Sequence, residues 1–246
     1  MAGTVYGLLF LAHTFQAFLF KTRYMIAAMA GTFLESVAYW VRIPSINDPF
    51  NIPKYATQYC LIIVSPVLIA ATQYIMLEKI IFFSYPQTSP VKHLSVYFIL
   101  CDIVTFLVQI FGSTILVSDD SKRDLGQAIL KAGLWLQVAS FAAYLAMAMI
   151  FYFRAQKLEQ AKPSLNPWRK IFYTLMISGS LVFIRSLFRI VQFSYGFRGP
   201  IATNETYLYC FDFGLLVLAM LSFNIVHPGS VLKAKFEKDA EIPLQP

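Results

Sequence analysis

Apolar residues run along this chain in seven long blocks, which short polar connections separate. An α-helix needs about 20 mostly apolar residues to cross a bilayer. The blocks have about that length or more, so we expect an all-α, polytopic, integral membrane protein: a bundle of seven transmembrane helices. The expected spans are residues 4–20, 24–43, 56–78, 94–117, 124–153, 169–195 and 206–226.

Charge and proline mark the connections between these blocks. The turn SDDSKRDLG separates the fourth block from the fifth, and the basic segment RAQKLEQAKPSLNPWRK separates the fifth from the sixth. Pro228 follows the last block, and proline cannot continue a helix without losing a backbone hydrogen bond. We therefore expect a transmembrane domain over residues 1–230 and a short polar tail over residues 231–246.

Lys and Arg are unevenly shared between the two sets of connections. Twelve lie after the first, third and fifth spans or in the tail, against five or six in the remaining connections. Cytoplasmic loops carry the excess of positive charge in membrane proteins. We therefore expect the N-terminus outside and the C-terminus cytoplasmic, in the plasma membrane or an internal membrane. Asn204, in the sequon Asn204-Glu-Thr, then lies outside as a glycosylation candidate.

The composition narrows the class further. The chain is 58% hydrophobic and 13% charged, whereas soluble domains carry about 25% charged residues. The net charge of +7 follows from membrane topology and indicates no nucleic-acid partner. Cys60, Cys101 and Cys210 form no CxxC pair and no Walker loop is present, so we predict no metal site and no cofactor. We expect these cysteines to be ordinary packing residues.

Polar and ionisable side chains inside the spans are the candidate functional residues. Within a span they are spaced by four or seven residues, which places them on one face of a helix. Helices with such stripes bury them by turning them toward one another. The candidates for ligand binding or proton relay are Glu35, Tyr39, Arg42, Asp102, Gln109, Gln137, Arg185, Arg189, Gln192, Glu205, Tyr209 and Asp212.

The cost of burying charge makes this pattern informative. An Asp or Arg at mid-bilayer costs about 2.5–3.5 kcal/mol, and five deep residues facing lipid would cost roughly 12–17 kcal/mol. They are Glu35, Asp102, Arg185, Arg189 and Asp212. A protein's whole stability is about 5–15 kcal/mol, so these residues must pair or line a hydrated cavity. We expect a polar pocket that opens toward the outer side.

A structural interpretation stands beside the functional one. Buried ion pairs can fix the register of helices without binding a ligand. His13 is then a hydrogen-bonded core residue, and Gln109 and Gln137 hold helices together.

Seven motifs, in order along nearly the whole chain, carry a family resemblance. They are E-x-x-x-Y-x-x-R from Glu35, SPVLIAATQY, DIVTFLVQIFGS, LGQAILKAGLWLQ, IRSLFRIVQFSYG, E-x-x-x-Y-x-x-D from Glu205, and the closing HPG. In these the chain resembles the fungal RTA-like family of seven-helix lipid-translocating exporters, named for resistance to aminocholesterol. It departs at Gln192, where the family often has an acid, and in its shorter tails. The resemblance implies movement of amphiphiles such as sphingoid bases, sterol-like amines or tetrapyrroles.

Three functions stay open at this point. The first is a transporter or translocase of lipid-like molecules, driven by protons or by the substrate gradient, with Glu35, Asp102 or Asp212 as proton carriers. The second is a membrane-embedded isomerase or cyclase, with Glu35 and Asp212 as acids, although no GxSxG or HExxH motif is present. The third is a receptor-like sensor, which the seven-helix topology alone suggests.

Overall fold

The computed structural model describes residues 1–47, 52–84, 93–118, 120–159, 168–195 and 204–229. The long helices are α1 (Ala2–Phe20), α2 (Ile26–Asn47), α3 (Ile52–Ser84), α4 (Leu94–Ser118), α5 (Arg123–Glu159) and α6 (Trp168–Ser194). The last transmembrane segment joins α8 (Glu205–Tyr207), the π-helix η3 (Leu208–Gly214) and α9 (Leu215–Ile225). Two short 3-10 turns, η1 (Arg23–Met25) and η2 (Asp120–Lys122), precede α2 and α5.

The prediction of seven transmembrane helices is confirmed. The helices that are long and apolar enough to cross a bilayer, within the described ranges, cover Ala2–Phe20, Arg23–Pro44, Cys60–Phe82, Leu94–Leu116, Arg123–Lys157, Trp168–Ser194 and Leu208–Ile225. Most ends differ from the expected ones by a few residues. The third span lies about one turn later than expected, because the most apolar part of α3 comes after its polar start. The orientation of the termini stays a prediction, and the expected tail, residues 231–246, lies outside the described residues.

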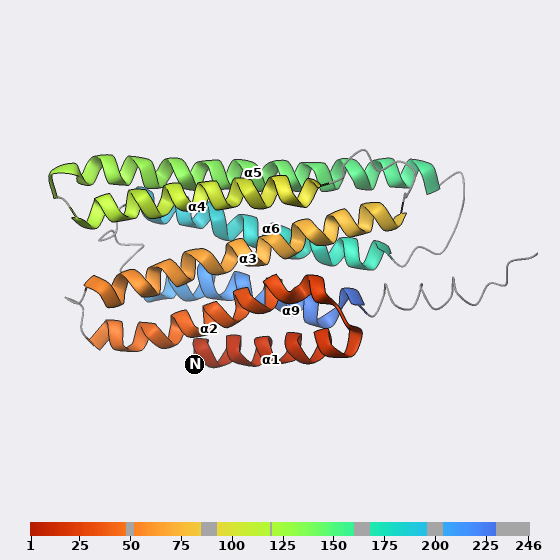
Figure 1. Cartoon of the computed structure of the whole chain (residues 1–246), viewed down its shortest axis with the longest axis horizontal. Coiled ribbons are helices and arrows are strands. Elements are labelled where there is room, and N and C mark those ends of the chain that lie inside the picture. The colour runs from red at the N-terminus through yellow and green to blue at the C-terminus, as the bar shows by residue number, and fades with distance from the viewer. Residues whose placement is uncertain (48–51, 85–92, 119, 160–167, 196–203, 230–246) are drawn as a thin grey trace, which may run out of the picture.

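The helices pack as an antiparallel bundle (Figure 1). Neighbours in sequence are neighbours in space: α2 packs on α1 and α3, and α5 packs on α4 and α6. The last segment closes the bundle by packing on α6 and α1. In Figure 1, α4 and α5 form one edge, α1 forms the other, and α3 and α6 lie between them. The central helices α3 and α6 contact each other directly, so their side chains set the interior.

Glycines bring α4 and α5 unusually close together. A Cβ on Gly112 would lie 2.5 Å from the backbone nitrogen of Leu130, and a Cβ on Gly126 would lie 2.6 Å from that of Leu116. Both distances are shorter than atoms tolerate, so only glycine fits here. Small residues that let backbones approach are the usual means of packing helices in membranes.

The outer surface of the bundle is apolar. Its exposed side chains include Leu11, Phe15, Val104, Leu107 and Phe111, which suits contact with lipid tails. The three cysteines, expected to be ordinary packing residues, are also exposed, so they do not pack between the helices. Cys101 shows the reason, since successive residues of a helix point about 100° apart and its neighbour Asp102 is buried.

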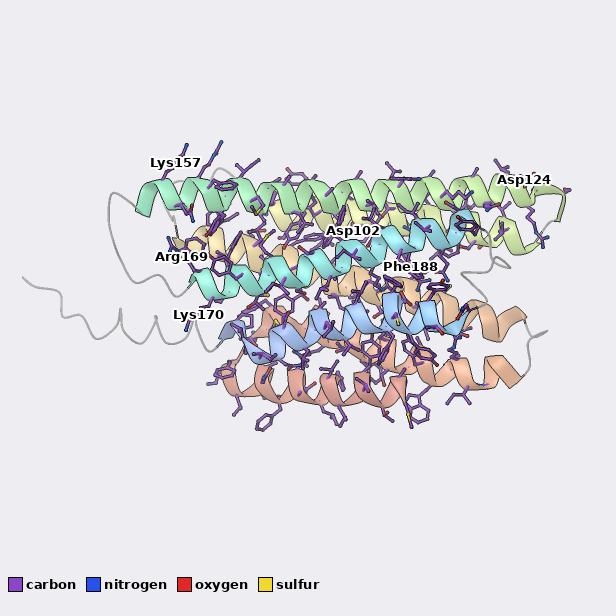
Figure 2. All side chains as sticks on the ribbon, turned by 180° about the vertical axis from the view of Figure 1, so that it is seen from behind. Asp102, Asp124, Lys157, Arg169, Lys170 and Phe188 are labelled. Carbon is purple, nitrogen blue, oxygen red and sulfur yellow. The ribbon has the colours of Figure 1, made fainter. Side chains whose placement is uncertain are left out.

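Charged side chains sort along the length of the bundle. Lys157, Arg169 and Lys170 gather at one end, where α5 ends and α6 begins, and Asp124 lies near the other end (Figure 2). Asp102 lies close to the middle of the bundle (Figure 2) and is 1% exposed. This carboxyl is therefore surrounded by protein inside the membrane-spanning part of α4, Leu94–Leu116.

Candidate functional site

Two arginines of α6 bind one carboxylate of the last segment. Nη2 of Arg185 lies 2.8 Å from Oδ1 of Asp212. Nε of Arg189 donates to Oδ1 of Asp212 at 3.1 Å, and Nη2 of Arg189 donates to Oδ2 at 2.8 Å. All three side chains are buried, Asp212 completely. The four-residue spacing of the arginines puts them one turn apart on the same face of α6, so both reach the same acid.

The π-helix η3 presents Asp212 to these arginines. Its backbone hydrogen bonds run from residue i to i+5, a wider turn that occurs often at functional sites. Within it, the Phe213 carbonyl accepts a hydrogen bond from the hydroxyl of Tyr6 at 3.1 Å. The Tyr6 ring stacks on that of Tyr39, with centroids 5.7 Å apart, and both rings meet the Phe213 ring edge to face. The first, second and last membrane helices are thereby joined beside the ion pairs.

Proline gives Arg185 a second partner. Pro66 lies inside α3 and has no backbone N–H, so the carbonyl of Ile62, four residues earlier, lacks its usual helical donor. Nη2 of Arg185 donates to this carbonyl at 3.3 Å. A transmembrane helix tolerates a proline where a neighbouring helix satisfies the freed carbonyl, and the arginine does so here.

Glu35 is the second acid near the arginines. Its side chain is 0% exposed, and it lies close enough to Arg185 and Asp212 for both to act on it electrostatically. Neither carboxylate oxygen has a hydrogen-bond partner among the described residues. The hydroxyl of Ser65 lies within reach of this carboxyl, but it donates its single proton to the Gly31 carbonyl at 2.7 Å and so has none left for Glu35. Glu35 therefore keeps its full capacity to accept hydrogen bonds or a proton.

These four side chains define what we call the charge cluster: Glu35, Arg185, Arg189 and Asp212. Two positive charges face two negative ones when all four are ionised, so the cluster is neutral as a whole. Its bonding is unequal, since Asp212 receives contacts from both arginines and Glu35 receives no hydrogen bond from any described residue.

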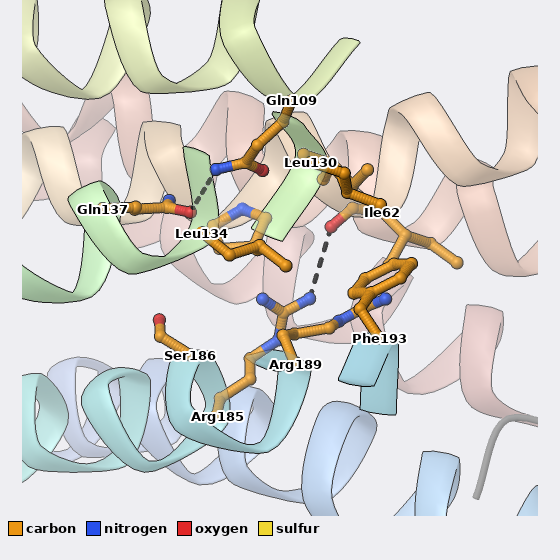
Figure 3. Close-up of a pocket in the computed structure, with 11 residues that line it drawn as sticks. Ile62, Gln109, Leu130, Leu134, Gln137, Arg185, Ser186, Arg189 and Phe193 are labelled. Carbon is orange, nitrogen blue, oxygen red and sulfur yellow. Dashed lines mark hydrogen bonds between the residues drawn. The ribbon is translucent and has the colours of Figure 1, made fainter. Parts of the chain in front are cut away.

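A small cavity adjoins the charge cluster between α3, α4, α5 and α6 (Figure 3). Its volume is about 20 Å³, and a water molecule needs about 10–15 Å³. The cavity therefore has room for one or two waters. Across it, Nε2 of Gln109 donates to Oε1 of Gln137 at 2.9 Å, which agrees with the expectation that these glutamines hold helices together. The lining residues that Figure 3 labels are Ile62, Gln109, Leu130, Leu134, Gln137, Arg185, Ser186, Arg189 and Phe193.

Several predicted site residues lie away from the charge cluster. Asp102 bonds to Tyr74 of α3. Tyr209 is 40% exposed, Arg42 is half-buried, and the side chain of Glu205 lies outside the described side chains. Gln192 is buried, and its Oε1 has no partner among the described residues. Asn204 is exposed, and its side-chain oxygen accepts from the Thr206 N–H at 3.0 Å.

His13 has the hydrogen-bond contact expected of a core histidine. His13 is fully buried, and its Nε2 lies 3.1 Å from Nδ2 of Asn224 in α9. Gln16 donates to the Asn224 carbonyl at 2.9 Å. His13 therefore fits a core residue that joins α1 to α9. Within the described residues, no group of three or more His, Cys, Asp or Glu side chains is placed to hold a metal ion.

Sequence reasoning missed three contributors to the site. They are the Tyr6 hydroxyl, the Ile62 carbonyl and the hydroxyl of Tyr74. Tyr6 and Tyr74 belong to apolar runs, where a phenol gives no pattern of its own. The Ile62 carbonyl could have been found, because a proline within a transmembrane span identifies the carbonyl four residues before it as free.

The chain matches one family of known proteins over most of its length. The family model described as RTA1 like protein matches residues 28–235, which include the whole charge cluster but not Tyr6. Protein RTA1 of Saccharomyces cerevisiae is 28% identical over 227 residues, covering 91% of this chain and 68% of the relative. Protoporphyrin uptake protein 1 of the same yeast is 28% identical over 204 residues, covering 81% of this chain and 67% of the relative.

A third relative covers nearly the whole chain. The sphingoid long-chain base transporter RSB1 of Saccharomyces cerevisiae strain Lalvin EC1118 is 24% identical over 284 residues, covering 98% of this chain and 73% of the relative. No solved structure matches this chain.

Proposed function

We propose that this chain, which belongs to the RTA1-like family of membrane proteins, moves amphiphilic, lipid-like molecules across the bilayer and handles their polar headgroup at the charge cluster. The names of its relatives support transport, one of a sphingoid long-chain base and one of protoporphyrin. Those names point to transport rather than catalysis.

The observation that carries the proposal is the unpartnered carboxyl of Glu35. A fully buried carboxyl without hydrogen bonds is costly to hold, and a purely structural cluster would pair it as it pairs Asp212. Intramembrane ionisable residues mark ligand or ion pathways by default. A cationic headgroup would take the place that no described residue fills at Glu35, with Asp212 and its two arginines keeping the remaining charge balanced.

The arginines supply the complementary chemistry. Guanidinium groups bind carboxylates in a forked geometry, as Arg189 does with Asp212. A carboxylate headgroup would exchange with Asp212 at one of the two arginines. The cluster can therefore receive an amine through Glu35 or an acid through Arg185, which suits ligands of either charge.

The cavity beside the charge cluster is too small for such a ligand in this conformation. Its volume of about 20 Å³ admits water and no headgroup, so a ligand that binds here requires the helices around the cavity to separate. Headgroup entry from the outer side, with the N-terminus outside, is part of the proposal and follows from the distribution of Lys and Arg.

Transport in liposomes tests this function. Purified protein is reconstituted, and the movement of two probes, a fluorescent sphingoid base and protoporphyrin, is followed with wild type, Glu35→Gln and Glu78→Gln. Glu78 is the matched control because it lies on α3 outside the cluster, where it accepts from the Ser95 N–H at 2.9 Å. We expect wild type and Glu78→Gln to move the sphingoid base, and Glu35→Gln to lose at least tenfold.

Two results would contradict the proposal. One is a wild-type protein that moves neither probe above empty liposomes. The other is a Glu35→Gln protein, folded as judged by its melting temperature, that moves the sphingoid base as fast as wild type. Chemical conversion of a probe by the purified protein would favour an enzyme instead.

A further inference from the structure

A second buried carboxyl lies outside the charge cluster. Asp102 of α4 is 1% exposed, and its Oδ2 accepts a hydrogen bond from the hydroxyl of Tyr74 at 2.8 Å. Its Oδ1 has no hydrogen-bond partner among the described residues. No Lys, Arg or His of the described chain forms an ion pair with it. Asp102 therefore differs from Asp212, whose charge two arginines balance.

The described side chains around the Asp102–Tyr74 pair are mainly aromatic. Tyr74 packs against Phe98, Phe141 and Tyr144, with ring centroids 4.8–6.0 Å away. Tyr74 is the titratable group that contacts Asp102, and Tyr144 of α5 and Cys101 of α4 lie near Tyr74. Glu78 follows one turn further along α3. Glu78 is engaged by Ser95, and the hydroxyl of Tyr144 donates to the Gln73 carbonyl at 3.3 Å.

Among the described residues, no charged side chain of a neighbouring helix is found to act on Asp102. From α6, Ser178 accepts from Nε2 of Gln73 at 2.8 Å, and Cys101, beside Asp102 on α4, is exposed. A buried carboxylate without a counter-charge is costly inside a membrane protein. A proton on Oδ1 removes that charge and leaves Oδ2 free to accept from Tyr74.

We propose that Asp102 and Tyr74 form a reversible proton-binding site that couples proton movement to transport at the charge cluster. The coupling rests on the proposed function, whereas proton binding does not. The proton is carried on Oδ1 of Asp102, taken from water on one side of the membrane and released on the other. The Tyr74 hydroxyl holds the carboxyl in place in both forms.

Two helices connect this site to the cavity at the charge cluster. On α4, Asp102, Thr105 and Gln109 form one buried stripe, about 10 Å long at 1.5 Å per residue, and Gln109 lines the cavity. On α3, the helix of Tyr74 also carries Ile62 and Pro66 of the cavity wall. Loss of the proton leaves a negative charge on Asp102. This charge requires either the entry of water or a shift of α3 against α4, and a shift of α3 moves Ile62 and Pro66 in the cavity wall.

Infrared difference spectroscopy tests proton binding without any transport substrate. Purified wild-type protein is compared at high and low pH for the carbonyl stretch of a protonated carboxylic acid. We expect a band that Asp102→Asn lacks. Tyr74→Phe should move the pH midpoint of that band, and Tyr144→Phe, which loses a hydroxyl of the same aromatic group, should leave it unchanged. An unaltered band in Asp102→Asn would overturn the proton site.

Liposomes with an imposed pH gradient test the coupling. We expect the gradient to stimulate accumulation of the fluorescent sphingoid base at least severalfold in wild type, and to have no effect in Asp102→Asn. Asn can still accept from Tyr74, so this variant should fold, which its melting temperature checks. Persisting stimulation in Asp102→Asn would overturn the coupling. If wild type moves no probe, the proposed function and the coupling fail, and the infrared result alone decides the proton site.

Discussion

Arg185 donates a hydrogen bond at 3.3 Å to the backbone carbonyl of Ile62, a carbonyl that Pro66 leaves without its helical donor. The same guanidinium lies 2.8 Å from Asp212. One arginine thus joins the middle of α3 to the last membrane segment through α6. Both partners of Arg185 come from breaks in regular helix geometry. Pro66 frees the Ile62 carbonyl, and the π-helix η3 carries Asp212.

Replacing Pro66 should raise the stability of the protein and lower its transport activity. Pro66→Ala restores an N–H at position 66, which then donates to the Ile62 carbonyl and competes with Arg185. Removing a proline from a helix interior gains up to about 3 kcal/mol, and we expect part of that gain as a higher melting temperature in detergent. Probe transport should fall because Arg185 loses an anchor. A variant that is both less stable and fully active would contradict this.

The close contact of α4 and α5 should not accept a methyl group. Gly112→Ala places a Cβ 2.5 Å from the backbone of Leu130, and overpacking of this kind costs about 1–3 kcal/mol. Gly7→Ala is the control, because its Cβ would meet the Ser36 hydroxyl at an ordinary 3.5 Å. Melting temperatures should fall for the first variant and stay level or rise for the second. Equal melting temperatures would argue against the tight packing.

The two glutamines across the cavity should be coupled in a double-mutant cycle. Gln109→Leu or Gln137→Leu alone leaves an amide without its partner, whereas the double variant removes both. Hydrogen bonds between membrane helices average about 0.6 kcal/mol in such cycles, and we expect a coupling of about that size. Unfolding measured in mixed micelles checks it. Strictly additive effects would mean that this hydrogen bond stabilises nothing.

Asp212 should be essential to folding unless its partners are also neutralised. Asp212→Asn leaves two buried guanidiniums facing the single carboxyl of Glu35, so one positive charge has no counterpart, and breaking a buried pair costs about 3–5 kcal/mol. Adding Arg189→Gln removes that excess charge, so the double variant should regain part of the loss. Yields of monodisperse protein and melting temperatures check this. A double variant less stable than Asp212→Asn would contradict the pairing.

The C-terminal end of the bundle should weaken in acid. His227 follows the last span; its Nδ1 accepts from the Gly229 N–H at 3.1 Å, and its ring stacks on Phe20 with centroids 5.0 Å apart. Burial lowers the pKa of His227 to about 4, against about 6.5 when unfolded. The folded state therefore disfavours protonation of His227. The contribution of neutral His227 to stability is complete above about pH 6.5 and is lost as the pH falls toward 4.

Melting curves across this pH range measure the effect. We expect His227→Gln to show a shallower fall than wild type between pH 6.5 and 4, because it lacks the titrating ring. His93→Gln serves as the control, since His93 is exposed, and it should follow wild type. Parallel curves for wild type and His227→Gln would contradict the assignment.

Much of the fold follows from one physical rule. Bilayer thickness requires about 20 apolar residues per crossing, so each span could be found by length and hydropathy without knowing its neighbours. The meeting of Arg185, Arg189 and Asp212 could also be anticipated. Four-residue spacing places the arginines on one face, and the cost of exposing them to lipid requires an acid opposite.

The rest depends on helix rotation and irregular turns. Glu205, Tyr209 and Asp212 were expected on one face because their spacing suits 3.6 residues per turn. The π-helix winds more widely, so Asp212 points inward while Tyr209 is 40% exposed. Asp102 was expected near the arginines, but its partner Tyr74 became visible only once α3 and α4 were placed side by side.

The π-helix at Leu208–Gly214 closes i→i+5 hydrogen bonds, whereas α9 beyond it closes i→i+4. If the wide turn closed as i→i+4, the preceding residues would turn by about 100° against α9. Asp212 would then move away from both guanidiniums, and the Phe213 carbonyl would leave the Tyr6 hydroxyl. The contacts of His13 and Gln16 with Asn224 in α9 would remain, so the last segment is held by two sets of bonds, of which one depends on the wide turn.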